Sequence, residues 1–537
     1  MGIFSQREVC SKVASFLPVL LLFHILGISL GLRTDQLFGL VTLIFSLAFL
    51  WVYYITGEIP SRLYQLLDRR LVFLLISLYL LMWLAVIFLK ERSFQYHLFD
   101  TGIFSHNLIT FLKTGSYYSS ILAMPALADH FTPLLLLFSP LFAIEESIIW
   151  LPLIRLLAYA ASFYFLYKIT KSLGFPPFLQ SLFLLFWLLQ APYVQVLRFE
   201  FQPSSLGIPI VLAAFYLILE KKILGAYVIL LSVLGLKENM VLNYALFALY
   251  FLFYERSIKL FLLWFFSALV FGFAIYFSIP IITQSPVHHE SHFGLWEAWD
   301  KKILFVLKLL PYFALLPLFS LRSLLLFSAS CALSFLSRHP NMFTLNYHYH
   351  DIPTLFGLIT SLLVVKNIQE GRIALWRKYQ FHLKPLLFLL FLWVNTKTPA
   401  RTLYQAIPRE EHRILQREIE MLKSMLHGDE ILVVQENIGA SFLSFPHLKS
   451  LNEEDWLKYK DIRELHERLG PLVLFIFPVG ITSLEIGHFP ESFLYQEVKD
   501  RPLIPELRYL RVYCFLRGES QQLWQKGCLK SPAGRES

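Results

Sequence analysis

Charged residues are scarce in this sequence. They make up only 16% of its 537 residues, whereas soluble domains contain about 25%. Hydrophobic residues reach 56%, and the mean hydropathy is +0.57. These values exclude an ordinary soluble globular protein and favour a chain that is largely surrounded by lipid.

Cysteines and the common catalytic motifs are also lacking. The four cysteines, Cys10, Cys331, Cys514 and Cys528, form no CxxC pair and show no zinc-ligand spacing. No GxxxxGK[ST], GxSxG, HExxH or GxGxxG motif occurs. The sequence therefore gives no support for ATP-driven transport or for serine hydrolysis. Cys514 and Cys528 could pair if their domain faces an oxidising compartment.

Long apolar runs, by contrast, are abundant. The clearest is "LVFLLISLYLLMWLAVIFL" at 71–89, and a run of about 18 such residues indicates a transmembrane helix. We therefore predict an α-helical polytopic membrane protein with about 13 transmembrane helices, several of them short enough to be broken helices. The predicted spans lie near 14–32, 37–56, 71–90, 149–168, 179–196, 205–220, 223–236, 240–254, 259–281, 302–320, 322–336, 352–366 and 382–396.

The basic residues predict the orientation of these spans. The net charge is +9, but lysine and arginine lie between the hydrophobic runs rather than in one patch, which argues against nucleic-acid binding. Short loops rich in Lys and Arg belong in the cytoplasm. This rule places the N-terminus inside and puts 91–130 and the tail after 396 outside. The orientation requires that 131–147, with its two prolines, is an interfacial or re-entrant helix.

The tail differs in character from the rest. It begins with an amphipathic helix, "IPREEHRILQREIEMLKSMLHGDE", followed by the strand-like pieces "ILVVQ", "LVLFIF" and "YLRVYCFL". We therefore predict three parts: N-terminal transmembrane helices at 1–70, a transmembrane core at 71–396 with a first outer loop at 91–130, and an extracytoplasmic α/β domain at 397–537.

Two acidic sites follow the third span, in the first outer loop. Asp100 opens "GIFSHNLITFL", which contains His106, and Asp129-His130 precedes a proline-containing apolar run. Each site has a structural interpretation, because carboxylates favour helix N-termini. Each also has a functional one, since a carboxylate beside a membrane-facing pocket could act as a general base or a metal ligand.

Further polar residues lie in the other outer loops. In "LRFEFQPSSLGIP", an extended segment would direct Arg198, Glu200 and Gln202 to one side, as an aromatic belt with solvated partners or as the wall of a polar pocket. Lys237-Glu238 in "LGLKENMVL" would form the tip of a hairpin or would supply a cation for phosphate.

The histidine-rich pieces are "PVHHESHF" at 286–293 and "NYHYHD" at 346–351. In an extended segment His348 and His350 would share one face beside Tyr347, an arrangement that suits a metal ion or a phosphate. Histidines are also ordinary at membrane interfaces, so both interpretations stay open.

Five motifs together resemble a known family. "FDTGIFSH", "DHFTPLLLLFSPLFAI", "FEFQPSSLGIPI", "LKEN" and "NYHYHDIPTLFGLI" follow the order found in the bacterial and archaeal membrane family called domain of unknown function 2079. The resemblance spans about residues 75–365 and extends weakly to "GDEILVVQENIGASFLSFPHL" in the tail. The family's aspartate falls on Asp100, its Asp-His pair on Asp129-His130, and its Lys-Glu-Asp element on Lys237-Glu238 followed by Asn239.

That family is similar to the GT-C glycosyltransferases, so the resemblance implies a GT-C-like fold. It also implies transfer of a sugar from a polyprenyl-phosphate-linked donor on the outer face of the cytoplasmic membrane, with inversion. Asp100 would then be the catalytic base, and Lys237 and Arg198 would stabilise the leaving lipid phosphate. The substrate-binding residues would be His106, Asp129, His130, Arg198, Glu200, Gln202, Lys237, Glu238, Tyr347, His348 and His350. Two residues depart from the family pattern, because His106 replaces a usual Gln and Gln202 replaces a usual His.

The remaining expectations concern cofactors, partners and competing functions. A divalent metal, Mg or Mn, would draw on Asp100, Asp129 and His130 or on the histidine loops. The partners would be the lipid-linked sugar donor, an acceptor and membrane lipids, with no nucleic acid. The alternatives are a transporter or flippase of lipid-linked glycans and a non-catalytic scaffold whose outer domain binds a partner. The scarcity of ionisable residues within 259–281 and 352–366 weighs against the transporter.

Overall fold

The computed structural model describes most of the predicted membrane core and much of the tail. The described residues are 69–285, 294, 297–313, 315–345, 347, 349–372, 399–428, 430–450, 472–478, 481, 504 and 507–516. The predicted spans at 14–32, 37–56 and 382–396 lie outside them, as do the whole histidine-rich piece 286–293, His348 and Cys528.

The chain divides into two compact units that interleave along the sequence. The first takes the described residues within 69–84, 154–282 and 294–405. The second takes those within 85–153, 283–285 and 406–516. Helix α4 (Arg69–Arg92) contributes to both.

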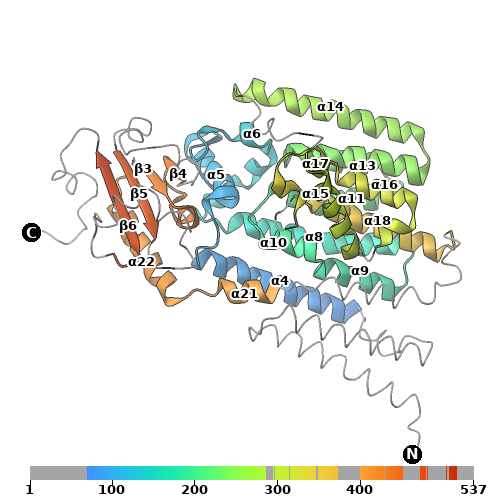
Figure 1. Ribbon diagram of the computed structural model, residues 1–537, viewed down its shortest axis with the longest axis horizontal. Coiled ribbons are helices and arrows are strands. Elements are labelled where there is room, and N and C mark those ends of the chain that lie inside the picture. The colour runs from blue at the N-terminus through green and yellow to red at the C-terminus, as the bar shows by residue number, and fades with distance from the viewer. Residues whose placement is uncertain are drawn as a thin grey trace, which may run out of the picture. The chain divides into compact units, whose positions relative to one another are not determined.

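The first unit is a bundle of helices (Figure 1). Its helices are α8 (Trp150–Ser172), α9 (Pro177–Leu189), α10 (Ala191–Arg198), α11 (Gly207–Leu219), α12 (Ile223–Leu231), α13 (Leu242–Tyr250), α14 (Ile258–Thr283), α15 (Trp299–Leu309), α16 (Leu321–Ser330), α17 (Ala332–Leu336), α18 (Asp351–Gln369) and α21 (Pro399–Ala406). One-turn helices join several of them: η3 (Pro203–Leu206), η4 (Ser232–Gly235), η5 (Glu238–Val241), η6 (Phe251–Glu255), η8 (Leu310–Phe313), η9 (Leu316–Phe319) and η10 (Pro340–Phe343).

The long helices identify a polytopic membrane protein. Among the described residues, α4, α8, α14 and α18 are long and apolar enough to cross a bilayer. The α9–α10 pair would make a fifth span, although it bends by 42°. The other predicted spans in this part of the chain appear as shorter helices that one-turn segments interrupt. The predicted number of about 13 spans therefore stays a prediction.

Helices α18 and α14 differ in what surrounds them. The most apolar stretch of α18 is 89% buried, and α18 packs against α10 and α16. The corresponding stretch of α14 is only 22% buried. Large apolar side chains such as Phe266, Phe273 and Phe277 are exposed along it. Because a contiguous apolar surface of this size is costly in water, α14 presents a face suited to lipid.

The second unit begins at the C-terminal end of α4. It contains η1 (Leu98–Gly102), α5 (Ile103–Thr114), a two-residue hairpin of β1 (Tyr118–Ser119) and β2 (Met124–Pro125), α6 (Ala126–Asp129), η2 (Pro133–Phe138) and α7 (Ser139–Phe142). The apolar run predicted to be interfacial or re-entrant forms the ten residues Pro133–Phe142. At about 2.0 Å per residue in the 3-10 helix η2 and about 1.5 Å in α7, these cover about 18 Å of a bilayer core of about 30 Å, so this segment is too short to cross it.

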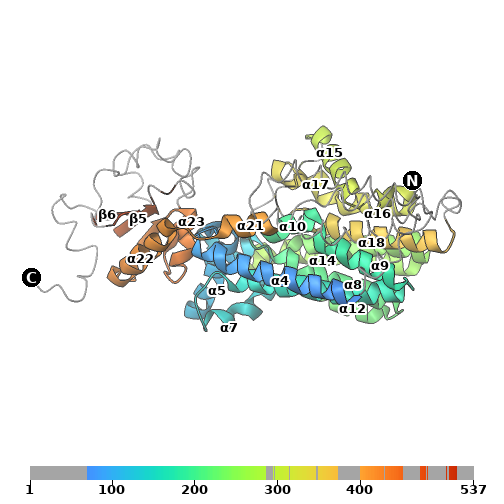
Figure 2. The same cartoon turned by 90° about the horizontal axis from the view of Figure 1, so that it is seen from below.

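The rest of this unit is an α/β arrangement. Strands β3 (Ile431–Val434), β4 (Leu448–Ser450), β5 (Leu472–Pro478) and β6 (Leu510–Leu516) form a sheet in the order β4-β3-β5-β6. Strand β3 is parallel to β4 and β5, and β6 is antiparallel to β5. Helix α22 (Glu410–Met425) packs against β6 (Figure 2), and the short helices α23 (Glu436–Gly439) and η11 (Ala440–Phe442) follow β3.

Glu418 fixes α22 to the sheet. Its carboxylate accepts hydrogen bonds from the backbone N–H groups of Arg508, Tyr509 and Leu510, at 2.6, 2.9 and 2.8 Å. Hydrogen bonds to a charged group are stronger than those between neutral groups. One carboxylate therefore sets the position of α22 at the start of β6.

Candidate functional site

Asp100 occupies an unusual backbone conformation directly before α5. Its φ and ψ are 51° and −94°, in the left-handed half of conformational space that favours glycine. The cap of α5 is Gly102 and carries no side-chain hydrogen bond, so Asp100 is not the N-cap of that helix. The side chain of Asp100 is half-buried. Holding a non-glycine residue in such a region costs of order 1–3 kcal/mol.

Asp129 and His130 lie at the end of α6, in the same unit. The His130 ring stacks on Phe104 of α5, with ring centroids 6.3 Å apart. Burial raises the pKa of the neighbouring Tyr117 to about 12, and the charge of Asp129 adds to that shift. The Tyr117 hydroxyl forms a hydrogen bond of 3.1 Å with Thr132. Asp129 thus lies close to a buried phenol rather than in open solvent.

His106 is buried within α5, with only 1% of its surface exposed. Its Nδ1 lies 2.9 Å from the carbonyl oxygen of Leu443, and its Nε2 lies 2.8 Å from Ser120 Oγ. Since a carbonyl can only accept, Nδ1 carries a proton and donates to Leu443. Ser120 Oγ is also 2.8 Å from the carbonyl oxygen of Leu448. His106 therefore joins the segment that follows α4 to the tail.

A second polar group surrounds Lys237 in the helical unit. Lys237 is 5% exposed, and its Nζ donates to Gln202 Oε1 at 3.1 Å. The carboxylate of Asp351, at the start of α18, interacts electrostatically with Lys237 and accepts a hydrogen bond from Ser204. A buried ammonium group requires such partners, because its desolvation is costly. Lys237 is therefore the centre of a buried polar cluster rather than the exposed tip of a hairpin.

Arg155 supplies a further buried cation in this unit. It lies in the second turn of α8 and is 3% exposed. Its Nη1 donates to the carbonyl oxygens of Val196, Phe199 and Glu200, at 3.1, 3.0 and 2.8 Å, and its Nη2 donates to Leu197 O at 2.9 Å. These carbonyls belong to the C-terminal end of α10 and the residues after it. A cation at this end stabilises the helix dipole.

Sequence reasoning missed Arg155, although a signal was present. It is an arginine inside the predicted span 149–168, and an ionisable residue within a span marks a site or a structural pairing by default. Asp351 and Ser204 also belong to the Lys237 cluster, and neither was among the predicted site residues. Their place in this cluster results from the packing of α18 against α10, which the sequence alone does not show.

Arg198, Glu200 and Gln202 do not share one environment, which corrects the prediction that all three point to one side. Arg198 is the last residue of α10, is exposed, and donates to Gln405 Oε1 at 3.3 Å. Glu200 and Gln202 are buried. The helix continues through Arg198, so the alternation of a strand does not apply there. Glu238 begins η5 and is half-buried.

The predicted extended segment at 346–351 is not extended at its end, which is a second correction. His350 has φ and ψ of −101° and 14°, in a turn, and Asp351 is already helical. His350 is fully buried, and its Nε2 lies 2.8 Å from the carbonyl oxygen of Pro192. The ring of Tyr347 contacts Phe199 edge to face at 5.5 Å. His348 lies outside the described residues.

Polar side chains without partners lie beside the bend between α9 and α10. Gln190, at the bend, is fully buried, and neither atom of its amide has a hydrogen-bond partner among the described residues. The same holds for the hydroxyls of Tyr193 and Thr354. Tyr193 interacts electrostatically with both Arg155 and Asp351. Buried groups of this kind need a partner, such as water or a ligand.

The comparison with known families agrees with the sequence motifs. The family model described as "Predicted membrane protein (DUF2079)" matches residues 90–424, which is more than half of the chain. The chain belongs to this family. No curated protein matches it. In this DUF2079 member the family match includes both the Asp100 loop and the Lys237 cluster.

The described part of this DUF2079 protein contains no group of side chains that could form a metal site. No three or more His, Cys, Asp or Glu side chains there lie close enough to hold a metal ion. Asp100, Asp129 and His130 are therefore not assembled as a ligand set. The expectation of Mg or Mn stays a prediction, as do the substrate-binding roles of the residues described above.

Proposed function

We propose that this DUF2079 protein is a GT-C-like glycosyltransferase that uses a polyprenyl-phosphate-linked sugar on the outer face of the cytoplasmic membrane. An acceptor hydroxyl oxygen attacks the anomeric carbon of the sugar, with inversion. The bond from that carbon to the phosphate oxygen breaks, and the lipid phosphate leaves with the bonding electrons. The Asp100 carboxylate takes the proton of the acceptor hydroxyl.

The observation that carries the proposal is the backbone of Asp100. Asp100 follows the end of the long helix α4 by eight residues, and holding its backbone at φ 51° costs free energy that other contacts of the fold must offset. Strained residues of this kind cluster at active sites, where the strain fixes a reactive group in place. The position just past α4 also suits a reaction at the membrane surface, where a lipid-linked sugar presents its phosphate.

The Lys237 cluster supports the second half of the reaction. The leaving lipid phosphate develops negative charge, and a preorganised cation in a desolvated site stabilises that charge strongly. Lys237 is buried and is held by Gln202 and Asp351, so its ammonium group is fixed before any substrate arrives. Arg198 is exposed at the end of α10 and would meet the phosphate only at the surface.

The test replaces the proposed base and leaves the fold intact. In a deletion strain we expect Asp100→Asn to fail to restore the wild-type cell-envelope glycans, measured by mass spectrometry. Loss of a general base lowers the rate by about 10²–10⁴-fold. Asp300→Asn is the matched control, because Asp300 is an exposed first-turn acid of α15. Full restoration by a normally expressed Asp100→Asn would refute the proposal.

One observation favours the alternative of a transporter for lipid-linked glycans. Discontinuous spans line substrate sites in many transporters, and α9–α10 is such a bent pair with the unpartnered Gln190 at its break. A transporter would keep working in Asp100→Asn but would fail in Gln190→Leu. The transferase predicts the opposite order of sensitivity, so the two variants compared in one strain separate the two functions.

A further inference from the structure

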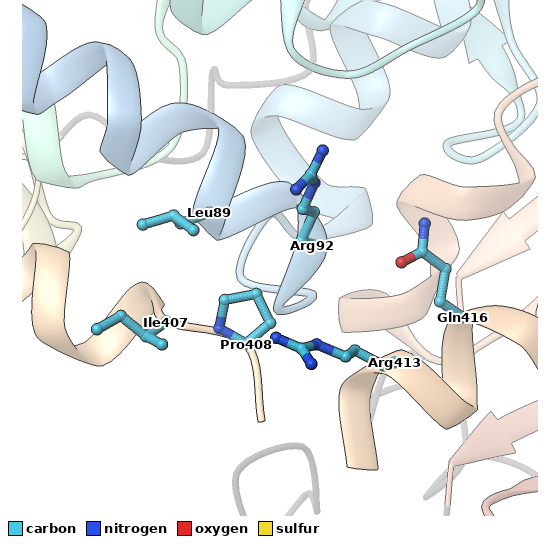
Figure 3. Close-up of a pocket in the computed structure, with 6 residues that line it drawn as sticks. All are labelled: Leu89, Arg92, Ile407, Pro408, Arg413 and Gln416. Atoms are coloured by element: carbon cyan, nitrogen blue, oxygen red, sulfur yellow. The ribbon is translucent and has the colours of Figure 1, made fainter. Parts of the chain in front are cut away.

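The second unit contains a surface pocket that the proposed reaction does not use. Its volume is about 440 Å³. It is lined by Leu89 and Arg92 from the end of α4, by Ile407 and Pro408 just after α21, and by Arg413 and Gln416 from the first turns of α22 (Figure 3). Segments more than 300 residues apart in sequence thus form one concave site.

The pocket is positively charged and contains no carboxylate among its lining residues. The side chains of Arg92 and Arg413 form no ion pair or side-chain hydrogen bond with any described residue. The acids nearest along the chain are Glu91, directly before Arg92, and Glu410 and Glu411, before Arg413 on α22. Glu91 accepts a hydrogen bond of 2.7 Å from Ser147, and it also interacts electrostatically with Arg92. Two guanidinium groups in a pocket that no carboxylate lines favour an anionic ligand.

The other wall of the pocket is apolar. Leu89, Ile407 and Pro408 form it, and Ile407 is 53% exposed. Apolar side chains next to two arginines are typical of the boundary between water and lipid, where basic side chains anchor a protein.

The length of α4 also indicates that the pocket lies at the boundary between water and lipid. The helix has 24 residues with a mean hydropathy of 2.8 in its most apolar stretch. At 1.5 Å per residue it measures about 36 Å, slightly more than a bilayer core of about 30 Å. Arg92 is its last residue and therefore falls at the level of the lipid headgroups.

We propose that this pocket binds the phosphate group of an anionic membrane phospholipid. The two guanidinium groups bind the phosphate oxygens, for which their planar forks are suited. The acyl chains lie against Leu89 and Ile407, and Gln416 offers an amide to the headgroup. The bound lipid holds the start of α22 to the end of α4, and thereby fixes the sheet domain to the membrane surface. This role is independent of the sugar donor.

The experiment is a lipid titration of the full-length protein in detergent, followed by native mass spectrometry. The probes are phosphatidylglycerol, which is anionic, and phosphatidylcholine, which is not. We expect tight binding of one phosphatidylglycerol molecule and at least tenfold weaker binding of phosphatidylcholine. In Arg92→Gln/Arg413→Gln the affinity for phosphatidylglycerol falls at least tenfold.

Matched variants separate the site from general surface charge. Arg417→Gln removes one positive charge from the same helix outside the pocket and should leave binding unchanged. Arg413→Lys keeps the charge but loses the fork, so binding should weaken severalfold in a variant that folds as the wild type does. Equal losses in Arg413→Gln and Arg417→Gln would overturn the proposal.

A last set of measurements distinguishes a site that binds a lipid from one that binds a soluble anion. Inorganic phosphate at millimolar concentration should not displace phosphatidylglycerol, because it lacks the acyl chains that contact the apolar wall. Ile407→Gln should weaken lipid binding. Displacement by inorganic phosphate, together with an Ile407→Gln variant that binds normally, would identify a site for soluble phosphate and contradict a lipid site.

Discussion

The buried imidazole of His106 joins parts of the chain that are more than 300 residues apart. It was predicted as a substrate contact, and both of its ring nitrogens are engaged, by Leu443 and Ser120. Burial lowers the pKa of His106, the hydrogen bond that it donates to the Leu443 carbonyl opposes this shift, and the positive charge of Lys113 adds to it. The ring is therefore neutral in the folded protein near neutral pH.

This lowered pKa predicts that acid weakens the second unit. A histidine that is harder to protonate when folded gives stability that is complete above the unfolded pKa of about 6.5 and is lost as the pH falls below it. His412 on α22 acts in the same direction, because burial lowers its pKa more than Glu411 raises it, and Arg409 also lowers it. We expect amide hydrogen exchange in α5 and around Leu443 to quicken severalfold between pH 7.5 and 5.5.

His106→Asn is the control for this prediction. An asparagine amide can still donate to Leu443 but does not titrate. The acid-induced increase in exchange around Leu443 should therefore be smaller in His106→Asn, with His412 left as the remaining source. An increase as large as that of the wild type would show that His106 does not carry the effect.

At the scale of the element, the bent pair α9–α10 depends on a residue from another helix. Arg155 donates four hydrogen bonds to carbonyl groups at the end of α10. Its removal leaves buried carbonyls unpaired, and each hydrogen bond to a charged group contributes about 1.5–3 kcal/mol. We expect Arg155→Met to destabilise the protein by at least about 3 kcal/mol, seen as a lower melting temperature in detergent.

The matching surface change should have little effect. Lys259→Met removes an exposed charge at the start of α14, and changes of this kind usually stay within about 0.5 kcal/mol. Arg155→Lys keeps the positive charge but has fewer hydrogen-bond donors. Its melting temperature should therefore lie between those of Arg155→Met and Lys259→Met. If Arg155→Met and Lys259→Met have the same melting temperature, the hydrogen bonds from Arg155 to the carbonyl groups do not hold α10 in place.

The sequence predicted some elements well and others poorly, for identifiable reasons. The long uninterrupted runs gave α4 and α14 to within three residues, since apolar length alone determines such spans. The single span predicted at 179–196 is bent at Gln190, and the next helix has a proline, Pro192, in its first turn. A proline there is a helix-start signal, and it could have indicated the break.

The site was less predictable than the spans. Asp100 drew attention through its place after a long apolar run, but its backbone conformation has no signature in the sequence. Lys237 was expected at an exposed hairpin tip or on a phosphate. Its burial beside Gln202, 35 residues earlier, and Asp351, 114 residues later, arises from helix packing, which a local pattern does not encode.

At the scale of the whole molecule, the second unit is assembled mainly from two distant segments, 85–153 and 406–516, with 283–285 as a third, short piece. The predicted boundary gave the tail its own domain at 397–537, and that division stays a prediction. The contacts, however, link the tail to the residues that follow α4. The backbone of Gly439 approaches Leu98 so closely that an added Cβ would lie 2.9 Å from that side chain. Lys113 Nζ donates to the Ser444 carbonyl at 3.0 Å.

These contacts predict that the tail does not fold alone. We expect residues 406–537 expressed in isolation to lack a cooperative thermal transition by circular dichroism, because Leu98 and His106 would be missing from their core. The same segment fused to residues 93–150 should regain one. A cooperative transition in the isolated tail would contradict the shared core.

The interleaving also has a consequence for synthesis. The first half of the second unit ends near residue 153 and the second half begins near 406, so 406 − 153 = 253 residues separate them. At about 5–20 residues per second, the first half waits about 13–50 s for its partner. During that interval the surface that His106 and Leu98 later bury is uncovered, so the nascent chain is most vulnerable to proteases and most dependent on chaperones at this stage.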